Sequence, residues 1–152
     1  MLPRRKSRIM SLSRRWAAAL YVLLDTLCVG VGMGVPIFCI AFGLPVGWAI
    51  ARRVSGQALP VTATLRSVLK SAALSAGWTL VLMLAIWTPT ARMLFDPRAD
   101  LANFGVPLIL YDPRASFIGW LALMILISPF LQLLTTLFAA HLTLAWTRPG
   151  TA

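Results

Sequence analysis

The chain has 152 residues, of which 59 % are hydrophobic and 12 % are charged. A soluble domain of this size does not use so much apolar surface, and here the apolar residues form long blocks almost free of charge. This pattern excludes an ordinary soluble fold and predicts an integral membrane protein.

The formal net charge is +10, and much of it lies in residues 1–15, ahead of the first apolar block. Basic residues in that place orient a membrane protein and contact anionic phospholipid head groups. We therefore expect a basic cytoplasmic segment whose partner is the lipid bilayer and not nucleic acid. Its six basic residues are Arg4, Arg5, Lys6, Arg8, Arg14 and Arg15.

The first apolar block, residues 16–51, is too long for one straight span. As a single helix it would measure about 54 Å against a hydrocarbon core of about 30 Å. Its middle, from Gly30 to Pro36, is rich in glycine and ends in a residue that cannot donate a helical hydrogen bond, so the chain can reverse there. We predict two short helices, residues 16–33 and 35–51, that form a tight hairpin.

The distribution of basic residues supports this hairpin. With it, eleven of the fourteen basic residues fall on the cytoplasmic side, against nine for a single kinked span. A re-entrant hairpin that does not cross fully predicts the same sidedness and stays open as an alternative.

Two further apolar blocks predict helices at residues 65–88 and 117–146. Together with the hairpin they give an all-α, four-transmembrane-helix bundle over residues 16–146, with both termini in the cytoplasm and a cytoplasmic tail at residues 147–152. We expect a multi-pass protein of a bacterial or archaeal inner membrane.

The outer-side loop, residues 89–116, contains a short repeat. Asp96-Pro97-Arg98 recurs sixteen residues later as Asp112-Pro113-Arg114. Asp followed by Pro commonly opens a helix, because the carboxylate accepts free backbone donors and proline fits the first helical turn. We predict that each copy caps a helix; a ligand clamp formed by Asp96, Arg98, Asp112 and Arg114 is the alternative.

Asp25 is an ionisable residue deep in a predicted span, which makes it a candidate site by default. Pro45 leaves the carbonyl of Ala41 without its helical donor, so a neutral Asp25 could donate to that oxygen or to another interior polar group. Desolvation disfavours the anion, and we therefore expect Asp25 to be buried and protonated. The alternative role is a proton or cation relay.

His141 is the chain's one histidine and lies near the end of the last predicted helix. It could be an axial ligand of a tetrapyrrole, or an interfacial or hydrogen-bonded residue. It could also share the bundle interior with Asp25. The sequence lacks the second His and the Glu of zinc hydrolase motifs, and we predict no enzyme and no metal site.

Two cysteines and several small residues complete the candidate features. Cys28 and Cys39 are equidistant from the proposed turn, so we expect them at one depth, both reduced. Small residues four apart predict close helix packing in the first three helices, whereas the last helix, rich in Leu, Ile and Phe with Pro129 at an expected kink, should face lipid or a partner. The pairs are Gly30 and Gly34, Gly43 and Gly47, Ser71 and Ser75, and Ala73 and Gly77.

These features predict a non-catalytic accessory or assembly subunit of a larger membrane protein complex, with other membrane subunits or copies of itself as partners. The small aqueous segments and nearly charge-free spans favour it. Two alternatives remain: a small oligomeric transporter or channel protomer that uses Asp25, and the membrane part of a sensory system.

Overall fold

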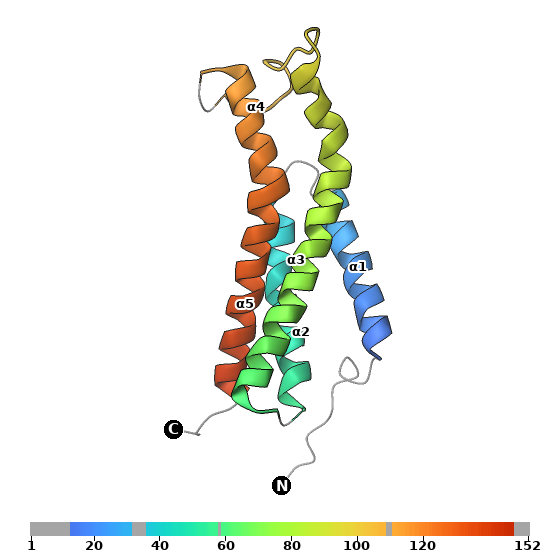
Figure 1. The fold of residues 1–152 in the computed structure, drawn as a ribbon, viewed down its shortest axis with the longest axis vertical. Coiled ribbons are helices and arrows are strands. Elements are labelled where there is room, and N and C mark those ends of the chain that lie inside the picture. Colours follow the sequence, from blue (N-terminus) through green and yellow to red (C-terminus); the bar gives the residue numbers. More distant parts are fainter. Residues whose placement is uncertain (1–12, 32–35, 58, 109–110, 148–152) are drawn as a thin grey trace.

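The computed structural model describes residues 13–31, 36–57, 59–108 and 111–147, and these residues form helices and connecting turns without a β-strand. Four rods of helix make up the bundle (Figure 1). In chain order the elements are α1 (Arg14–Val31), α2 (Ile37–Ser55), α3 (Val61–Ala91), the 3₁₀ turn η2 (Arg92–Phe95), α4 (Pro113–Ala122), the π-helical segment η3 (Leu123–Ile127) and α5 (Ser128–Thr147).

Three of these rods are long and apolar enough to cross a membrane: Ile37–Ser55, Val61–Phe95 and Pro113–Thr147. The first rod, α1, has 18 residues but carries Arg14, Arg15 and Asp25, which keeps it out of this group. The expected four helices are therefore present, and three of them have the length and composition of a membrane span. The glycine-rich turn predicted between the first two helices falls largely on residues 32–35, outside the described residues.

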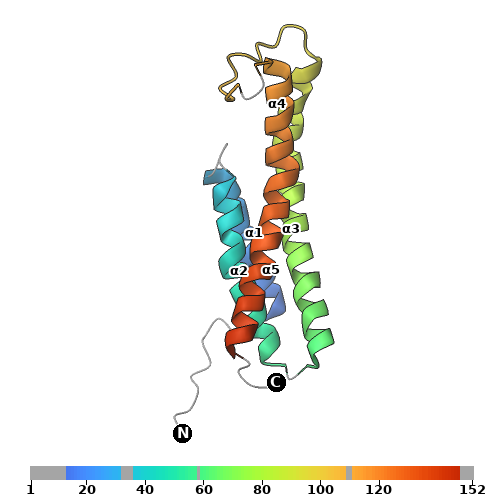
Figure 2. The same cartoon turned by 90° about the vertical axis from the view of Figure 1, so that its left-hand side faces the viewer.

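The last two rods are longer than predicted. Each has 35 residues and measures about 52 Å, well beyond the hydrocarbon core of about 30 Å. The hydropathy of a sequence marks the lipid-embedded part of a helix and not its ends, so residues 61–64 and 89–95, outside the predicted apolar block, continue the third rod. Figures 1 and 2 show that the α1–α2 hairpin ends well short of the outer ends of α3 and α4.

The closest packing joins α2 to α5. A Cβ atom on Gly43 would overlap the Thr135 hydroxyl, and one on Gly47 would overlap the backbone carbonyl of Thr136. These two glycines thus let the helix backbones approach, as their spacing predicts. By contrast, Gly30 and Gly77 have no heavy atom of another segment within 4 Å of such a Cβ.

The expectation that the last helix packs less closely than the first three is therefore wrong. One face of α5 is lined with small and polar residues, and it receives the glycines of α2. The Leu and Phe residues that suggested a lipid-facing helix occupy the other faces. Residues of the packed face are Gln132, Thr135, Thr136, Ala139 and Ala140.

A π-helical segment, η3, lies just before Pro129, where we expected a kink. Proline has no backbone N–H, so the carbonyl of Ile125 loses its usual helical donor. A wider π turn is a common way to accommodate an extra residue and a disturbed hydrogen-bond ladder. Pro129 itself is buried within α5.

Aromatic rings hold the end of the bundle at which α4 begins. Phe104 of the connecting loop packs edge-on against Phe117, with ring centroids 5.0 Å apart, and Trp87 packs edge-on against Trp120 at 4.5 Å. Phe104 also lies 5.9 Å from Trp120. The loop therefore folds back onto α4 instead of extending away from the bundle.

Candidate functional site

The candidate site is a buried polar cluster around Asp25, which is 0 % exposed. Thr79 Oγ1 of α3 donates to Asp25 Oδ2 across 2.9 Å, and Gln132 Nε2 of α5 donates to Asp25 Oδ1 across 3.1 Å. Both partners are themselves fully buried. A single carboxyl on α1 thus connects three helices.

Tyr21 lies one turn before Asp25 on the same face of α1 and extends the cluster. Its hydroxyl donates to the backbone carbonyl of Ser75 across 2.8 Å and lies 3.3 Å from Thr79 Oγ1. Its ring stacks on Phe42 of α2, with centroids 5.9 Å apart. Tyr21 therefore joins the polar interior to the apolar contact between α1 and α2.

The cluster lies far from both charged ends of the bundle. Along α3, Lys70 precedes Thr79 by nine residues and Arg92 follows it by thirteen. At 1.5 Å per residue these separations are about 14 Å and about 20 Å. Lys70 is exposed and its ammonium is too distant to pair with Asp25, so hydrogen bonds, not an ion pair, hold the carboxyl.

Two buried oxygen atoms of α5 have no hydrogen-bond partner among the described residues: Gln132 Oε1, which belongs to the amide that contacts Asp25, and Ser128 Oγ. Ser128 lies one helical turn from Gln132 on the same face of α5. An unpaired buried polar group costs about 1–3 kcal/mol, so these oxygens are sites where a water, a proton or a cation would be stabilised. Rotating the Gln132 amide would also present Oε1 to a protonated Asp25.

The structure corrects the expected contact between Asp25 and Ala41. Both Ala41 and Pro45 are exposed, on the side of α2 that faces away from the cluster. The neighbouring carbonyl, that of Ile40, accepts a hydrogen bond from Thr135 Oγ1 across 2.8 Å. Asp25 turns toward α3 and α5 because those helices offer side-chain donors at its depth. Of the two partners that we predicted, the Ala41 carbonyl or another interior polar group, the structure shows the second.

His141 does not share the interior with Asp25. Its side chain is exposed on α5, and its Nδ1 lies 2.8 Å from the carbonyl of Leu137 in the same helix. Gln132, which contacts Asp25, is nine residues or about 14 Å away along the helix. Among the described residues no three His, Cys, Asp or Glu side chains gather as metal ligands. The role of His141 as an axial ligand of a tetrapyrrole stays a prediction.

Both cysteines are free thiols near the hairpin end. Cys39 is buried in a cluster with Val29 of α1 and Met83 of α3. Since Cys28 is the residue before Val29, the two cysteines lie at nearly the same level of the hairpin. They pack as small apolar residues there.

The outer-loop repeat uses the same capping bond twice with different outcomes. Asp112 Oδ1 accepts from the backbone N–H of Arg114 across 2.9 Å and caps α4, and Asp96 Oδ1 accepts from that of Arg98 across 2.9 Å. The first copy forms a turn and no helix, which corrects that half of the prediction. All four of these side chains are exposed, and no ion pair joins them.

Asp100, in the same loop, is held by its own neighbour. The side-chain amide of Asn103 donates to Asp100 Oδ2 across 2.7 Å, and the backbone N–H of Asn103 donates to Oδ1 across 3.2 Å. These bonds favour the anion and lower the pKa of Asp100 below its usual range. Asp100 therefore organises this part of the loop as a charged carboxylate.

The described residues include only part of the basic segment that we expect to contact anionic lipid. Arg4, Arg5, Lys6 and Arg8 lie outside the described residues, and the side chain of Arg14 does too. Arg15 is exposed at the start of α1.

Sequence reasoning missed Thr79, Gln132 and Tyr21, because it searched the spans for ionisable groups only. A usable signal was present: Ser128, Gln132 and Thr136 recur every four residues in an otherwise apolar helix. A polar face in a membrane helix usually points inward.

Comparison of the chain with protein-family models, with curated proteins and with solved structures gives no match. A functional proposal therefore has to rest on the geometry described above.

Proposed function

We propose that this chain is a non-catalytic accessory or assembly subunit of a larger membrane protein complex. The proposal rests on the surroundings of Asp25, which is fully buried and accepts hydrogen bonds from side chains of α3 and α5. A carboxyl placed in this way fixes the rotation of three helices relative to one another. Intramembrane hydrogen bonds of this kind contribute about 0.6 to 2 kcal/mol each, which suits a packing role.

The proposed arrangement in the membrane has four crossing helices with both termini in the cytoplasm. Along α3, Arg92 follows Lys70 by 22 positions, which is about 33 Å and close to the thickness of the hydrocarbon core. Trp87, near the outer end of this stretch, packs on the cluster that contains Val29 and Cys39. The α1–α2 hairpin contributes Val29 and Cys39 to that cluster beside Met83, which lies nine residues or about 14 Å short of Arg92 along α3, so a re-entrant hairpin stays open beside a full crossing.

The outward surface fits a protein that acts through contacts between helices. Large apolar side chains are exposed along the whole length of the long rods, and the longest connection between helices is that of residues 96–112. Apolar side chains outside the core suit either acyl chains or the helices of another subunit. The exposed residues on α3 to α5 include Leu74, Val81, Leu126, Phe130 and Phe138.

Purification from the native membrane tests this proposal. A tagged chain extracted in a mild detergent should retain other membrane proteins at a fixed ratio, measurable by mass spectrometry with quantified peptides. A matched preparation of Asp25→Leu, in which the helices lose their shared carboxyl, should retain less of them. Recovery of the intact chain alone, or only as a homo-oligomer, would contradict an accessory role.

A second candidate function is a small transporter or channel protomer in which Asp25 holds a proton or a cation. The two unpaired oxygens, Gln132 Oε1 and Ser128 Oγ, favour it, because they leave room in the hydrogen-bond network for an added proton or ion. Purified protein in liposomes that contain a pH-sensitive dye would show proton flux, and Asp25→Asn should abolish that flux. A wild-type chain with no flux above that of empty liposomes rejects this candidate.

A further inference from the structure

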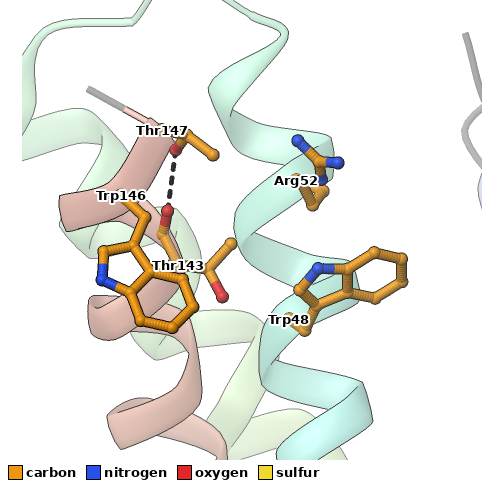
Figure 3. A pocket seen from close by; sticks show the side chains of 5 residues that line it. All are labelled: Trp48, Arg52, Thr143, Trp146 and Thr147. Carbon is orange, nitrogen blue, oxygen red and sulfur yellow. Dashed lines mark hydrogen bonds between the residues drawn. The ribbon is translucent and has the colours of Figure 1, made fainter. Parts of the chain in front are cut away.

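A cleft of about 280 Å³ lies between α2 and α5 at the end of the bundle where α2 finishes. Trp48 and Arg52 line it from α2, and Thr143, Trp146 and Thr147 line it from α5 (Figure 3). The two indole rings stand on opposite sides of the gap between the helices, with Thr143 between them. The cleft is about 14 Å or more along α5 from Gln132, and so it is separate from the Asp25 cluster.

Arg52 has no acidic side chain to neutralise it. The chain contains four acids and no Glu. Asp25 is buried in the cluster described above, and the other three, Asp96, Asp100 and Asp112, belong to the loop at the opposite end of the bundle (Figure 1). Arg52 instead lies over the Trp48 ring, with its Cζ 5.8 Å from the ring centroid. An anion from outside the chain would therefore find an unshared guanidinium held in place by an aromatic ring.

The hydroxyl groups of the cleft complement a different part of a ligand. Thr143 Oγ1 donates to the carbonyl of Ala139, and Thr147 Oγ1 donates to the carbonyl of Thr143. With their hydrogens committed to the helix, these oxygens offer lone pairs and accept from hydroxyl or ammonium donors. The cleft thus presents a cationic donor on one wall and acceptors on the other.

The place of the cleft identifies the source of such a ligand. Arg52 lies at the end of a helix that is long and apolar enough to cross a membrane, and tryptophans gather at the membrane–water interface. The volume of the cleft, about 280 Å³, is slightly smaller than the roughly 300 Å³ of the smallest pockets that hold drug-sized molecules. A cleft of this size suits a lipid head group and not a whole lipid. We propose that this cleft binds the head group of an anionic glycerophospholipid, with the phosphodiester on Arg52 and the head-group hydroxyls on Thr143 and Thr147.

The test uses the full chain in detergent, with phosphatidylglycerol or phosphatidylcholine added at defined concentrations. Native mass spectrometry measures how much of each lipid stays bound. We expect the wild-type chain to retain phosphatidylglycerol preferentially. Arg52→Gln should weaken that retention about tenfold, as expected for the loss of one charge-assisted hydrogen bond. Inorganic phosphate added in excess should not displace the lipid.

Arg66→Gln is the matched control, because Arg66 is exposed on α3 at the same end of the bundle and outside the cleft. It removes the same charge and should leave retention unchanged. Trp146→Leu provides a second test that does not depend on Arg52: this side chain is 76 % exposed, so its loss should spare the fold while weakening lipid retention several-fold.

Three results would overturn the proposal. Equal losses in Arg52→Gln and Arg66→Gln would show that lipid follows the overall charge and not a site. Displacement of the lipid by inorganic phosphate would assign the cleft to a soluble anion. Unchanged retention in both cleft variants would show that the lipid binds elsewhere.

Discussion

Thr79 Oγ1 and Asp25 Oδ2 lie 2.9 Å apart although the two residues are 54 positions apart in the chain. The bond joins α1 to α3 in the apolar middle of the bundle, and Gln132 adds α5 from the other side of the same carboxyl. The one acidic side chain in this part of the structure therefore specifies how the first helix is rotated against the two longest ones.

Replacing Asp25 separates a structural role from one that needs its charge. Asp25→Asn keeps an oxygen for Thr79 and adds an N–H that can donate to the unpaired Gln132 Oε1, so the unfolding free energy should change little. Asp25→Leu removes the shorter partner of Thr79 Oγ1 and of Gln132 Nε2 and leaves them the longer contacts to the Ser75 carbonyl at 3.3 Å and the Tyr21 hydroxyl at 3.5 Å, so it should cost about 1–3 kcal/mol. Unfolding in mixed micelles, followed by circular dichroism, measures both variants. If Asp25→Asn loses as much unfolding free energy as Asp25→Leu, the charge of the carboxylate matters. That result would favour the hypothesis that Asp25 is a proton or cation relay.

Substitution of glycine by alanine should destabilise the protein far more at Gly47 of α2 than at Gly77 of α3. In Gly47→Ala the new methyl would overlap the carbonyl of Thr136, a backbone atom that cannot turn aside, so we expect a loss of about 1–3 kcal/mol. Gly77→Ala meets no other segment within 4 Å and should be neutral or stabilising by up to about 1 kcal/mol. Both variants can be compared by thermal unfolding in one detergent. Equal tolerance would mean that α2 and α5 do not approach as closely as described.

The two Asp-Pro corners of the outer loop should differ in their effect on helix α4. Asp112→Ala removes a cap and should destabilise the first turn of α4 by about 1 kcal/mol. Asp96→Ala removes the same bond from a turn that starts no helix and should leave α4 unchanged. Hydrogen exchange of the amides at residues 114–117 reports the difference directly. Faster exchange there in Asp96→Ala as well would indicate that the two corners support each other.

The proposed topology places Gln57 and Asn103 on opposite sides of the membrane. Both side chains are exposed. Single cysteines at these positions, in a chain with Cys28→Ala and Cys39→Ala, should react with an impermeant maleimide from opposite faces of sealed vesicles. Labelling of both from one face would remove the four-crossing arrangement.

Sequence patterns were sufficient where the deciding interaction is local or repeats along one helix. The Asp112 cap follows from a bond between residues two positions apart, and the Gly43–Gly47 contact follows from a spacing that places both on one face. The burial of Asp25 also follows, because a charged group facing lipid is costly.

The partners of Asp25 could not be predicted in the same way. Which side chains meet it depends on how each helix is rotated and shifted against the others, and small differences in packing decide this. The π turn at η3 is one such shift, since the residues before it are displaced around the helix relative to those after it. The exposed position of His141 also depends on how α5 is rotated against α2. His141 lies on the side of α5 opposite to the face that packs on α2.

The contact between α2 and α5 has a consequence for biosynthesis. Thr135 donates to the carbonyl of Ile40 although 95 residues separate them. At a synthesis rate of about 5–20 residues per second, the second helix emerges from the ribosome about 5 to 19 seconds before the helix that it packs against most closely. During that interval Gly43 and Gly47 face no partner from their own chain. The hairpin therefore stays without its closest helix partner until α5 has been synthesised.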